Sequence, residues 1–402
     1  MRPPPSTMGL AALAAALATV AAAPLQAAEL SWSGFGTLGY ARSDRDYTYE
    51  RFVDRDGTFK RDSLLGVQAS ADLTPRWSAT AQATLAPSSS DDQRWQPTLQ
   101  WAFLSYRAGN DVLLRAGKLR MPMYLYSENM NVGASYDVLH LPTEVYSTAP
   151  TNDYTGASFS KTWSLAAGDL SLDGYSGRTN VTARRQLGSS SAPAGLHTRS
   201  TGLVLSLRRD EDSWRIGLQR AKISVDGNYG AESGLAAGTT IPAGATGTGG
   251  DIAPGVPAGA GMAAIDTRVF LLGADVGLGG GWRAVGEYAR RHAVNAVTPK
   301  NSLGAYLTLL RKSGHWTSYA TLARLLTDAE ARRAANGHDG IDDQTASTLG
   351  AAYALTPSSK LKAEWMHVHI GAGSSLIDRA SGVATVRRQG MNLLSLSYSV
   401  AF

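Results

Sequence analysis

The sequence predicts an all-β fold, a transmembrane antiparallel β-barrel of about sixteen strands. Three observations predict it: polar and apolar residues alternate along most of the chain, the first 28 residues have the pattern of an export signal, and short connections alternate with long ones. A soluble all-β protein, such as a sandwich or a propeller, is the weaker alternative, because soluble sheets rarely combine these three features.

The amino terminus has the pattern of a secretory signal peptide. Arg2 gives a positive start, residues 8–23 carry no charge, and residues 26–28 end in two alanines. The apolar run is shorter than the roughly 20 residues that a membrane-spanning helix needs. We therefore expect residues 1–28 to be cleaved, after Ala27 or Ala28, and residues 29–402 to form one domain.

The two-residue alternation defines the strands. Apolar residues occupy the odd positions from Leu65 to Leu73, and they continue from Trp77 to Leu85 after a tight turn, while the even positions are mostly polar. Segments of this length suit tilted strands that cross a bilayer. Sixteen are predicted, at residues 30–42, 62–73, 77–86, 97–107, 111–119, 154–165, 169–177, 199–208, 213–225, 266–277, 282–294, 302–312, 316–326, 346–355, 360–370 and 389–402.

The connections between these strands fall into two classes. Short turns join alternate pairs, and the other connections are long, at residues 43–61, 120–153, 178–198, 226–265, 327–345 and 371–388, with two of middling length at 87–96 and 295–301. Outer-membrane barrels have short turns on the periplasmic side and long loops outside. Four tryptophans also begin strands just after short turns, where a membrane interface places amphipathic rings: Trp77, Trp214, Trp282 and Trp316.

The lipid environment requires the sheet to be closed. Within lipid every backbone donor and acceptor needs an internal partner, so a spanning sheet has no open edge. The composition agrees, since only 18% of the 402 residues are charged and half of each strand would face lipid. The chain has no cysteine, which excludes a disulfide scaffold and a thiol nucleophile.

Both ends of the predicted barrel carry a family resemblance. The last strand reads MNLLSLSYSVAF, and its Tyr398, Val400 and Phe402 resemble the signal by which the outer-membrane barrel assembly machinery recognises its substrates. The segment ELSWSGFGTLGYARSD resembles the first strand of Gram-negative porins, and the order of hairpins before a 34-residue third loop, residues 120–153, resembles the general porin plan. This resemblance implies a homotrimer, and a third loop that folds into the lumen.

A barrel of this width leaves an aqueous channel. We therefore predict a porin of the cell outer membrane for passive diffusion of small hydrophilic solutes and ions, with no catalytic residues and no cofactor. The wet faces of the strands would line the lumen, including Gln68, Ser70, Asp72, Thr80, Gln82, Ser158, Ser160, Thr162, Gln219, Asp275 and Glu364.

Charge at the narrowest point should set selectivity. Acids on the third loop would face wall arginines across the constriction and create a transverse field, although ordinary solvated loop residues are the alternative for each acid. The candidates for the pore lining and the constriction are Arg115, Glu128, Asp137, Glu144, Arg208, Arg215, Arg283, Glu287, Arg291 and Lys362. The third loop is also too apolar for a free external loop and is expected to pack against something.

The balance of charge favours anions weakly. The formal net charge is +5, and six basic lumen positions stand against four acidic ones. Other basic residues suit the phosphates of lipopolysaccharide in the surrounding outer-membrane lipid: Arg178, Arg184, Arg185, Arg332, Arg333, Arg387 and Arg388. Scattered charges do not favour a nucleic-acid partner.

Two alternatives to a general diffusion channel stay open. A solute-specific channel of the same fold would show an ordered row of wall arginines or aromatic residues and a saturable conductance. An outer-membrane enzyme is disfavoured, because the sequence places no nucleophile beside a base in a recognisable motif.

A metal site at His367 and His369 is also disfavoured, because Glu364 lies on the other face of that strand. The Gly-rich segment 227–263 lacks a phosphate-loop pattern.

Overall fold

A computed structural model describes residues 29–89, 91–149, 151–187, 190–225, 265–294, 301–328, 341–378 and 386–402. The expected signal peptide at residues 1–28 and the Gly-rich segment 227–263 lie outside these residues. In the part of the chain that the structure covers, no helix is long and apolar enough to cross a membrane.

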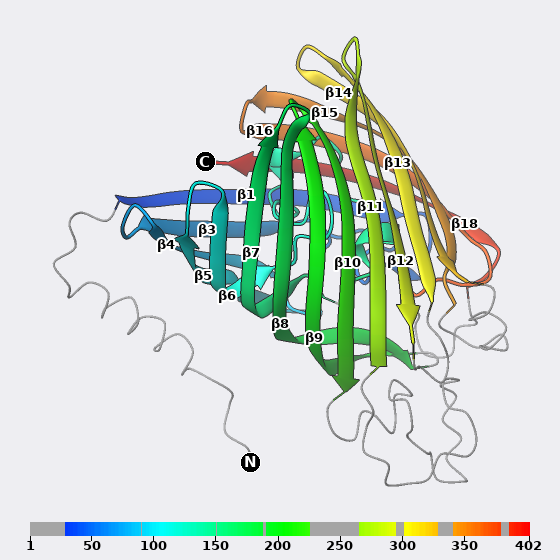
Figure 1. Ribbon diagram of the computed structural model, residues 1–402. Coiled ribbons are helices and arrows are strands. Elements are labelled where there is room, and N and C mark those ends of the chain that lie inside the picture. Colours follow the sequence, from blue (N-terminus) through cyan, green and yellow to red (C-terminus); the bar gives the residue numbers. More distant parts are fainter. Residues whose placement is uncertain are drawn as a thin grey trace, which may run out of the picture.

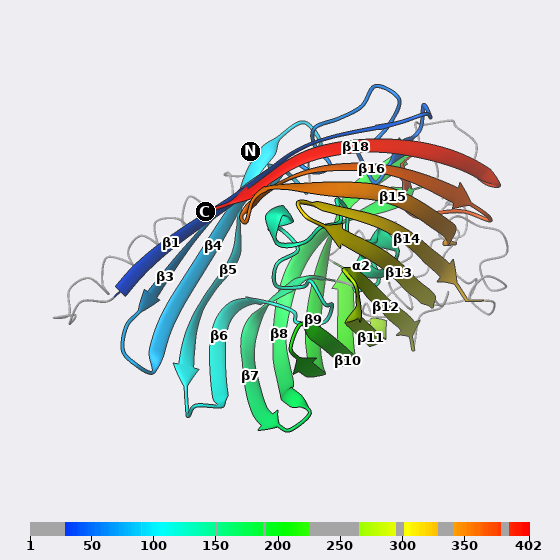
Figure 2. The same ribbon diagram turned by 90° about the horizontal axis from the view of Figure 1, so that it is seen from above.

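The chain forms a closed antiparallel barrel, as predicted (Figures 1 and 2). Each strand pairs with its neighbours in sequence, and the first barrel strand pairs with the last. The strands of the barrel are β1 (Glu29–Ser43), β3 (Leu64–Asp72), β4 (Trp77–Pro87), β5 (Trp95–Arg107), β6 (Val112–Arg120), β7 (Asp153–Leu165), β8 (Gly168–Leu187), β9 (Ser190–Arg209), β10 (Asp212–Val225), β11 (Ile265–Gly279), β12 (Trp282–Ala293), β13 (Ser302–Ser313), β14 (Trp316–Thr327), β15 (Asp343–Thr356), β16 (Ser359–Ile370) and β18 (Gln389–Ala401).

The seam between β1 and β18 closes the sheet. Their register runs from Phe35 opposite Ala401 to Ser43 opposite Leu393. Beyond it, the Gly34 N–H donates to the Phe402 carbonyl at 2.7 Å, and the Phe402 N–H donates to the Gly34 carbonyl at 2.9 Å. The carboxyl terminus is therefore part of the closure that a membrane requires.

The alternation in the sequence separates the two faces of the wall. On β18, Leu394 and Leu396 are 62% and 59% exposed on the outer face, whereas Ser395 and Ser397, which alternate with them, are 3% and 7% exposed. The tryptophans that begin β4, β12 and β14 are also exposed. The apolar face of the sheet therefore points outward, toward lipid.

One predicted loop is wrong. Residues 178–198 were expected to connect two strands, but β8 and β9 stay paired from Arg178 opposite Arg199 to Leu187 opposite Ser190. This part of the hairpin extends past the apolar stretch of the strands, so its residues no longer need an apolar face. The alternation of polar and apolar residues ends here, while the backbone pairing of the two strands continues.

Smaller elements lie between the barrel strands. In the first and last long loops, β2 (Thr48–Tyr49) pairs with β17 (Ile377–Asp378). The third loop, which connects β6 and β7 over residues 121–152, contains the 3-10 helix η1 (Gly133–Ser135) and the one-turn helix α2 (Thr143–Tyr146).

Candidate functional site

The third loop lies inside the ring of strands, as the view from above shows (Figure 2). Helix α2 contacts β12, β13 and β14, and η1 contacts β1 and β18. Pro142 ends the preceding segment, and its carbonyl accepts the Val145 and Tyr146 N–H groups that start the helical turn. The loop buries apolar side chains, including Met123, Leu139 and Val145. The inner wall is therefore the surface that covers them.

A histidine in this loop joins two other parts of the molecule. His140 lies 2.7 Å from Asp62 of the first loop through Nε2, and 2.7 Å from Glu364 of β16 through Nδ1. The Tyr319 hydroxyl donates to the second oxygen of Glu364 at 2.7 Å and accepts the Leu139 N–H at 2.9 Å. The imidazole is thus held between two carboxylates.

The charge of His140 follows from its neighbours. Burial lowers its pKa, and so does nearby Arg61, but Asp62 and Glu364 outweigh both and raise the pKa to about 9. Burial favours the neutral form of Asp62, but His140 outweighs it and lowers the pKa of that carboxyl. At neutral pH the ring is therefore an imidazolium that donates from both nitrogens.

Two lysines of β16 hold the neighbouring part of the loop. Lys362 donates to the carbonyls of Gly133 and Val138 at 2.6 and 2.7 Å, and its ammonium lies 4.3 Å from the centre of the Tyr136 ring. Only 3% of Lys362 is exposed. Lys360 donates to Asp137 at 2.5 Å.

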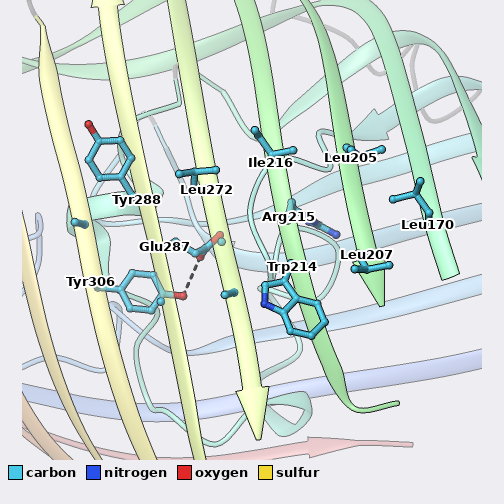
Figure 3. A pocket seen from close by; sticks show the side chains of 14 residues that line it. Leu170, Leu205, Leu207, Trp214, Arg215, Ile216, Leu272, Glu287, Tyr288 and Tyr306 are labelled. Atoms are coloured by element: carbon cyan, nitrogen blue, oxygen red, sulfur yellow. Dashed lines mark hydrogen bonds between the residues drawn. The ribbon is translucent and has the colours of Figure 1, made fainter. Parts of the chain in front are cut away.

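Glu287 of β12 and Arg215 of β10 bind the beginning of the loop. Glu287 accepts the Leu125 N–H at 2.7 Å and the Tyr306 hydroxyl at 2.9 Å, and Figure 3 shows the second of these bonds. Arg215 donates to the Tyr124 carbonyl. These two strand residues therefore bind the loop through its backbone.

The acid of α2 is enclosed. Glu144 is 3% exposed and accepts a hydrogen bond from Gln344 at 2.7 Å, while the same amide nitrogen donates to the Tyr49 hydroxyl at 2.8 Å. Burial raises the pKa of the Glu144 carboxyl. This side chain stabilises the packing of α2 and does not face the water of the channel.

The wall formed by β3, β4 and β5 carries neutral side chains that bond to one another. Gln82 donates to Gln68 at 3.1 Å, Trp101 donates to the same oxygen at 3.3 Å, and Gln100 donates to Thr84 at 2.7 Å. We call these five residues the amide wall. The hydrogen bonds among these five residues join strand to strand. The third loop reaches the amide wall only indirectly in the described part of the chain, through Arg120 of β6, which donates to Gln100 at 2.8 Å and to the Ser127 carbonyl at 3.4 Å.

The structure brings together five of the residues predicted for the constriction and separates the others. Asp137, Glu144, Arg215, Glu287 and Lys362 all lie where the third loop meets the wall. Asp137 pairs with Lys360, not with Arg115, which lies on β6 with its guanidinium 5.7 Å from the Phe103 ring. Of the rest, Glu128 is exposed on the loop, and Arg291 of β12 is half-buried and interacts electrostatically with Tyr124 of the loop. Arg208 is exposed near the end of β9, and Arg283 bonds Asp275 on β11.

Sequence reasoning missed His140, Asp62 and Gln344. Their partners are distant in the chain, since His140 is 78 residues from Asp62 and 224 from Glu364. The available signal was the position of His140 as a titratable residue within the apolar run from Val138 to Leu141.

The fold and the site define a class: a closed β-barrel with an apolar exterior and a loop bound inside its lumen. The chain belongs to the Gram-negative porin family, whose model matches residues 9–371. It is therefore an outer-membrane channel for passive diffusion of small hydrophilic solutes.

Solved structures show the same fold at low sequence identity. The anion-selective porin from Comamonas acidovorans has a TM-score of 0.56 and 12% identity, with 94% of this chain and 100% of that chain covered. A loop-deletion mutant of OmpT, an outer membrane protein of Vibrio cholerae, gives 0.57 and 12%, with 94% and 100% covered. Salmonella typhi OmpF in complex with daunomycin gives 0.56 and 10%, with 92% and 98% covered. No curated protein matches the chain.

Proposed function

We propose that this channel conducts small anions somewhat better than cations and performs no chemical step. The observation that supports the anion preference is that acids of the third loop are paired or buried. Asp137 is paired with Lys360 and Glu144 is buried, so two of the three predicted acids add little negative potential to the water. Arg115 lies on the opposite wall, on β6, and its Nε atom is buried and has no hydrogen-bond partner within the described part of the chain. The anion-selective porin among the structural neighbours supports this proposal by analogy.

Single-channel recording in a planar bilayer with a salt gradient tests both parts. We expect discrete conductance steps and a reversal potential displaced modestly toward that of the anion. A strongly cation-selective potential would contradict the preference, and no conductance would contradict the channel. Arg115→Glu should shift the reversal potential more than Arg387→Glu, whose site is exposed in the last loop; equal shifts would mean that Arg115 does not contribute to the selective region.

One observation favours a solute-specific channel as a second candidate. Arg115 lies beside Phe103, and Arg120 of the same strand has its guanidinium 5.2 Å from the Trp101 ring. Arginine beside an aromatic face suits a solute with both a negative charge and a flat ring. Benzoate is a suitable probe: saturable block of the chloride current favours this candidate, and a linear increase in current with benzoate concentration favours the general channel.

We also propose that the channel is a homotrimer. Small residues face outward side by side on three neighbouring strands, with Ala69 opposite Ala81 and Ala81 opposite Ala102. Such a surface allows barrels to approach closely, which agrees with the trimer implied by the porin resemblance. Ala81→Arg should convert the detergent-solubilised protein from trimer to monomer in native mass spectrometry, and a wild-type monomer would contradict the proposal.

The end of β18 is the proposed contact with the barrel assembly machinery. Tyr398 and Phe402 are exposed on the outer face, 40% and 83%, at the seam that closes the barrel. Deletion of Phe402 should lower the amount of heat-resistant barrel in outer-membrane fractions, while Leu394→Ala on the same face should not.

Lipopolysaccharide is the proposed lipid partner at the outer rim. Of the basic residues predicted for it, Arg332 and Arg333 lie outside the described residues, and Arg178 lies on β8.

A further inference from the structure

A cavity of about 330 Å³ lies between the first loop, the third loop and the wall formed by β1 and β18. Its lining includes Arg61 and Asp62 of the first loop, residues of the third loop on both sides of η1, and Ser397 and Ser399 of β18. Ser147, which also lines the cavity, is exposed, and the third loop that carries it lies inside the ring of strands (Figure 2). Small solutes in the lumen therefore have access to this cavity, which we call the loop cavity.

Arg61 is held firmly in the lining of the loop cavity, but one of its nitrogens is unused. The side chain is 6% exposed, and Glu50 accepts a hydrogen bond from Nε at 2.8 Å and lies 2.5 Å from Nη2. The Nη1 atom is buried and has no hydrogen-bond partner among the described residues. A buried donor without an acceptor is costly, so this position favours a ligand that supplies an acceptor.

Asp62, the next residue along the chain, offers the opposite charge. Its Oδ1 atom lies 2.7 Å from Nε2 of His140. Its Oδ2 atom is buried without a hydrogen-bond partner in the part of the chain that the structure describes. The carboxylate thus uses one oxygen for the imidazolium and keeps the other for a second donor. Two unsatisfied groups of opposite charge therefore line one cavity.

The charged residues that line the loop cavity balance one another. Glu50 and Asp62 carry two negative charges, and Arg61 and the imidazolium of His140 carry two positive ones. A simple cation would leave Nη1 of Arg61 without an acceptor, and a simple anion would leave Oδ2 of Asp62 without a donor. A ligand that carries both charges satisfies both groups and keeps the balance.

Much of the remaining lining is apolar. It includes Leu64, Met130, Tyr136, Leu139 and Leu141. All of these except Leu139 are half-buried, so apolar surface is left for a ligand to cover. Small-molecule sites commonly combine such a surface with a few polar groups, in volumes that begin at about 300 Å³. The lining therefore suits a small zwitterion with an apolar part.

We propose that the loop cavity binds an α-amino acid with an apolar side chain, its carboxylate on Arg61 and its ammonium on Asp62. The carboxylate accepts from Nη1 and the ammonium donates to Oδ2, and both hydrogen bonds are charge-assisted. This inference rests on the proposed diffusion channel, which brings solutes into the lumen, and is independent of the anion preference. Binding that is weak enough to allow release makes the entry of such amino acids saturable.

The test titrates the whole mature channel, in nanodiscs, with L-leucine by isothermal titration calorimetry. Two analogues separate the charges, because isocaproate lacks the ammonium and isoamylamine lacks the carboxylate. We expect leucine to bind at least about tenfold more tightly than either analogue, since each loses one charge-assisted hydrogen bond. An analogue that binds as tightly as leucine would overturn the proposal, and so would a leucine titration with no heat beyond that of dilution.

Two conservative variants test the named contacts. Arg61→Lys keeps a positive charge beside Glu50 but removes the second nitrogen of the guanidinium fork. Asp62→Asn keeps an oxygen for His140 and replaces the unpartnered oxygen with an amide donor. Each should weaken leucine binding at least about tenfold, and unchanged binding in either would overturn the proposal. Arg51→Lys is the matched control and should bind leucine as wild type does, because Arg51 pairs with Asp92 and is not part of the cavity lining.

Single-channel recording separates this inference from the proposed function. Discrete conductance steps in wild type without leucine binding would overturn the inference and leave the channel in place, whereas an absence of conductance would contradict the channel itself. The same recording shows whether each variant has assembled. If neither site variant assembles, the comparison of leucine with its two analogues on wild type decides the proposal.

Discussion

The two sides of the lumen use inward-facing polar residues differently. On the side that binds the third loop, charged groups of the wall are buried and form hydrogen bonds with the loop. Glu287 accepts the Leu125 N–H, Lys362 donates to two backbone carbonyls, and Glu364 binds the imidazole of His140. On the amide wall, neutral side chains bond one another between strands. A buried charge needs partners that meet all its hydrogen bonds. An inward-facing charged residue that the third loop covers therefore holds the loop in place. Such a residue contributes to ion selectivity only where water reaches it.

Glu364→Gln should have the largest effect on the loop-bearing side. It leaves the imidazolium of His140 with one carboxylate, and breaking a buried ion pair costs about 3 kcal/mol. We expect faster proteolysis of the third loop and a noisier single-channel current. Glu128→Gln, at an exposed acid of the same loop, is the control and should show the proteolysis rate and current noise of wild type. Equal noise in the two variants would show that Glu364 is not an anchor.

Lys362→Met should have the next largest effect. The carbonyls of Gly133 and Val138 lose a charged donor, which costs about 2 kcal/mol. The loop near η1 should then exchange its amide hydrogens faster, as measured by hydrogen–deuterium exchange with mass spectrometry. Unchanged hydrogen exchange in residues 130–139 would show that Lys362 does not hold this part of the loop.

Alkaline pH should loosen the same loop to a smaller extent. The pKa of His140 is raised from 6.5 to about 9, so its charge stabilises the folded loop fully below pH 6.5, and this contribution is lost as pH rises through 9. The effect is smaller because the neutral ring still donates one hydrogen bond. Current noise in wild type should rise between pH 8 and 10, and His140→Gln should show no such rise. A rise of the same size in both would assign the titration to another group.

Gln82→Ala on the amide wall should change least. It removes one neutral hydrogen bond, worth about 1 kcal/mol, and leaves the loop contacts intact. We expect a slightly larger conductance with unchanged noise. An increase in noise as large as that of Glu364→Gln would show that the two walls do not differ in the way described.

The contrast between the walls also explains what the sequence could predict. Strand positions follow from a local pattern, so the faces of β3, β4 and β18 were predictable, and so were the inward directions of Glu287, Lys362 and Glu364. Which inward residues the third loop covers depends on tertiary contacts that span up to 224 residues, and the alternation of polar and apolar residues does not reveal them. His140 was missed for this reason. The hairpin at residues 178–198 was missed because strands outside lipid lack the apolar face by which the others were found.

The position of the third loop inside the lumen is the central claim, and labelling of single cysteines tests it directly. The chain has no cysteine, so Glu128→Cys can be modified alone by a membrane-impermeant sulfonate thiol reagent during single-channel recording. Arg94→Cys is the control, because the Arg94 side chain is 81% exposed in the connection between β4 and β5. Modification should lower the current in discrete steps at Glu128→Cys and leave it unchanged at Arg94→Cys. A current unchanged by complete labelling of Glu128→Cys would place the loop outside the conducting path and contradict the account.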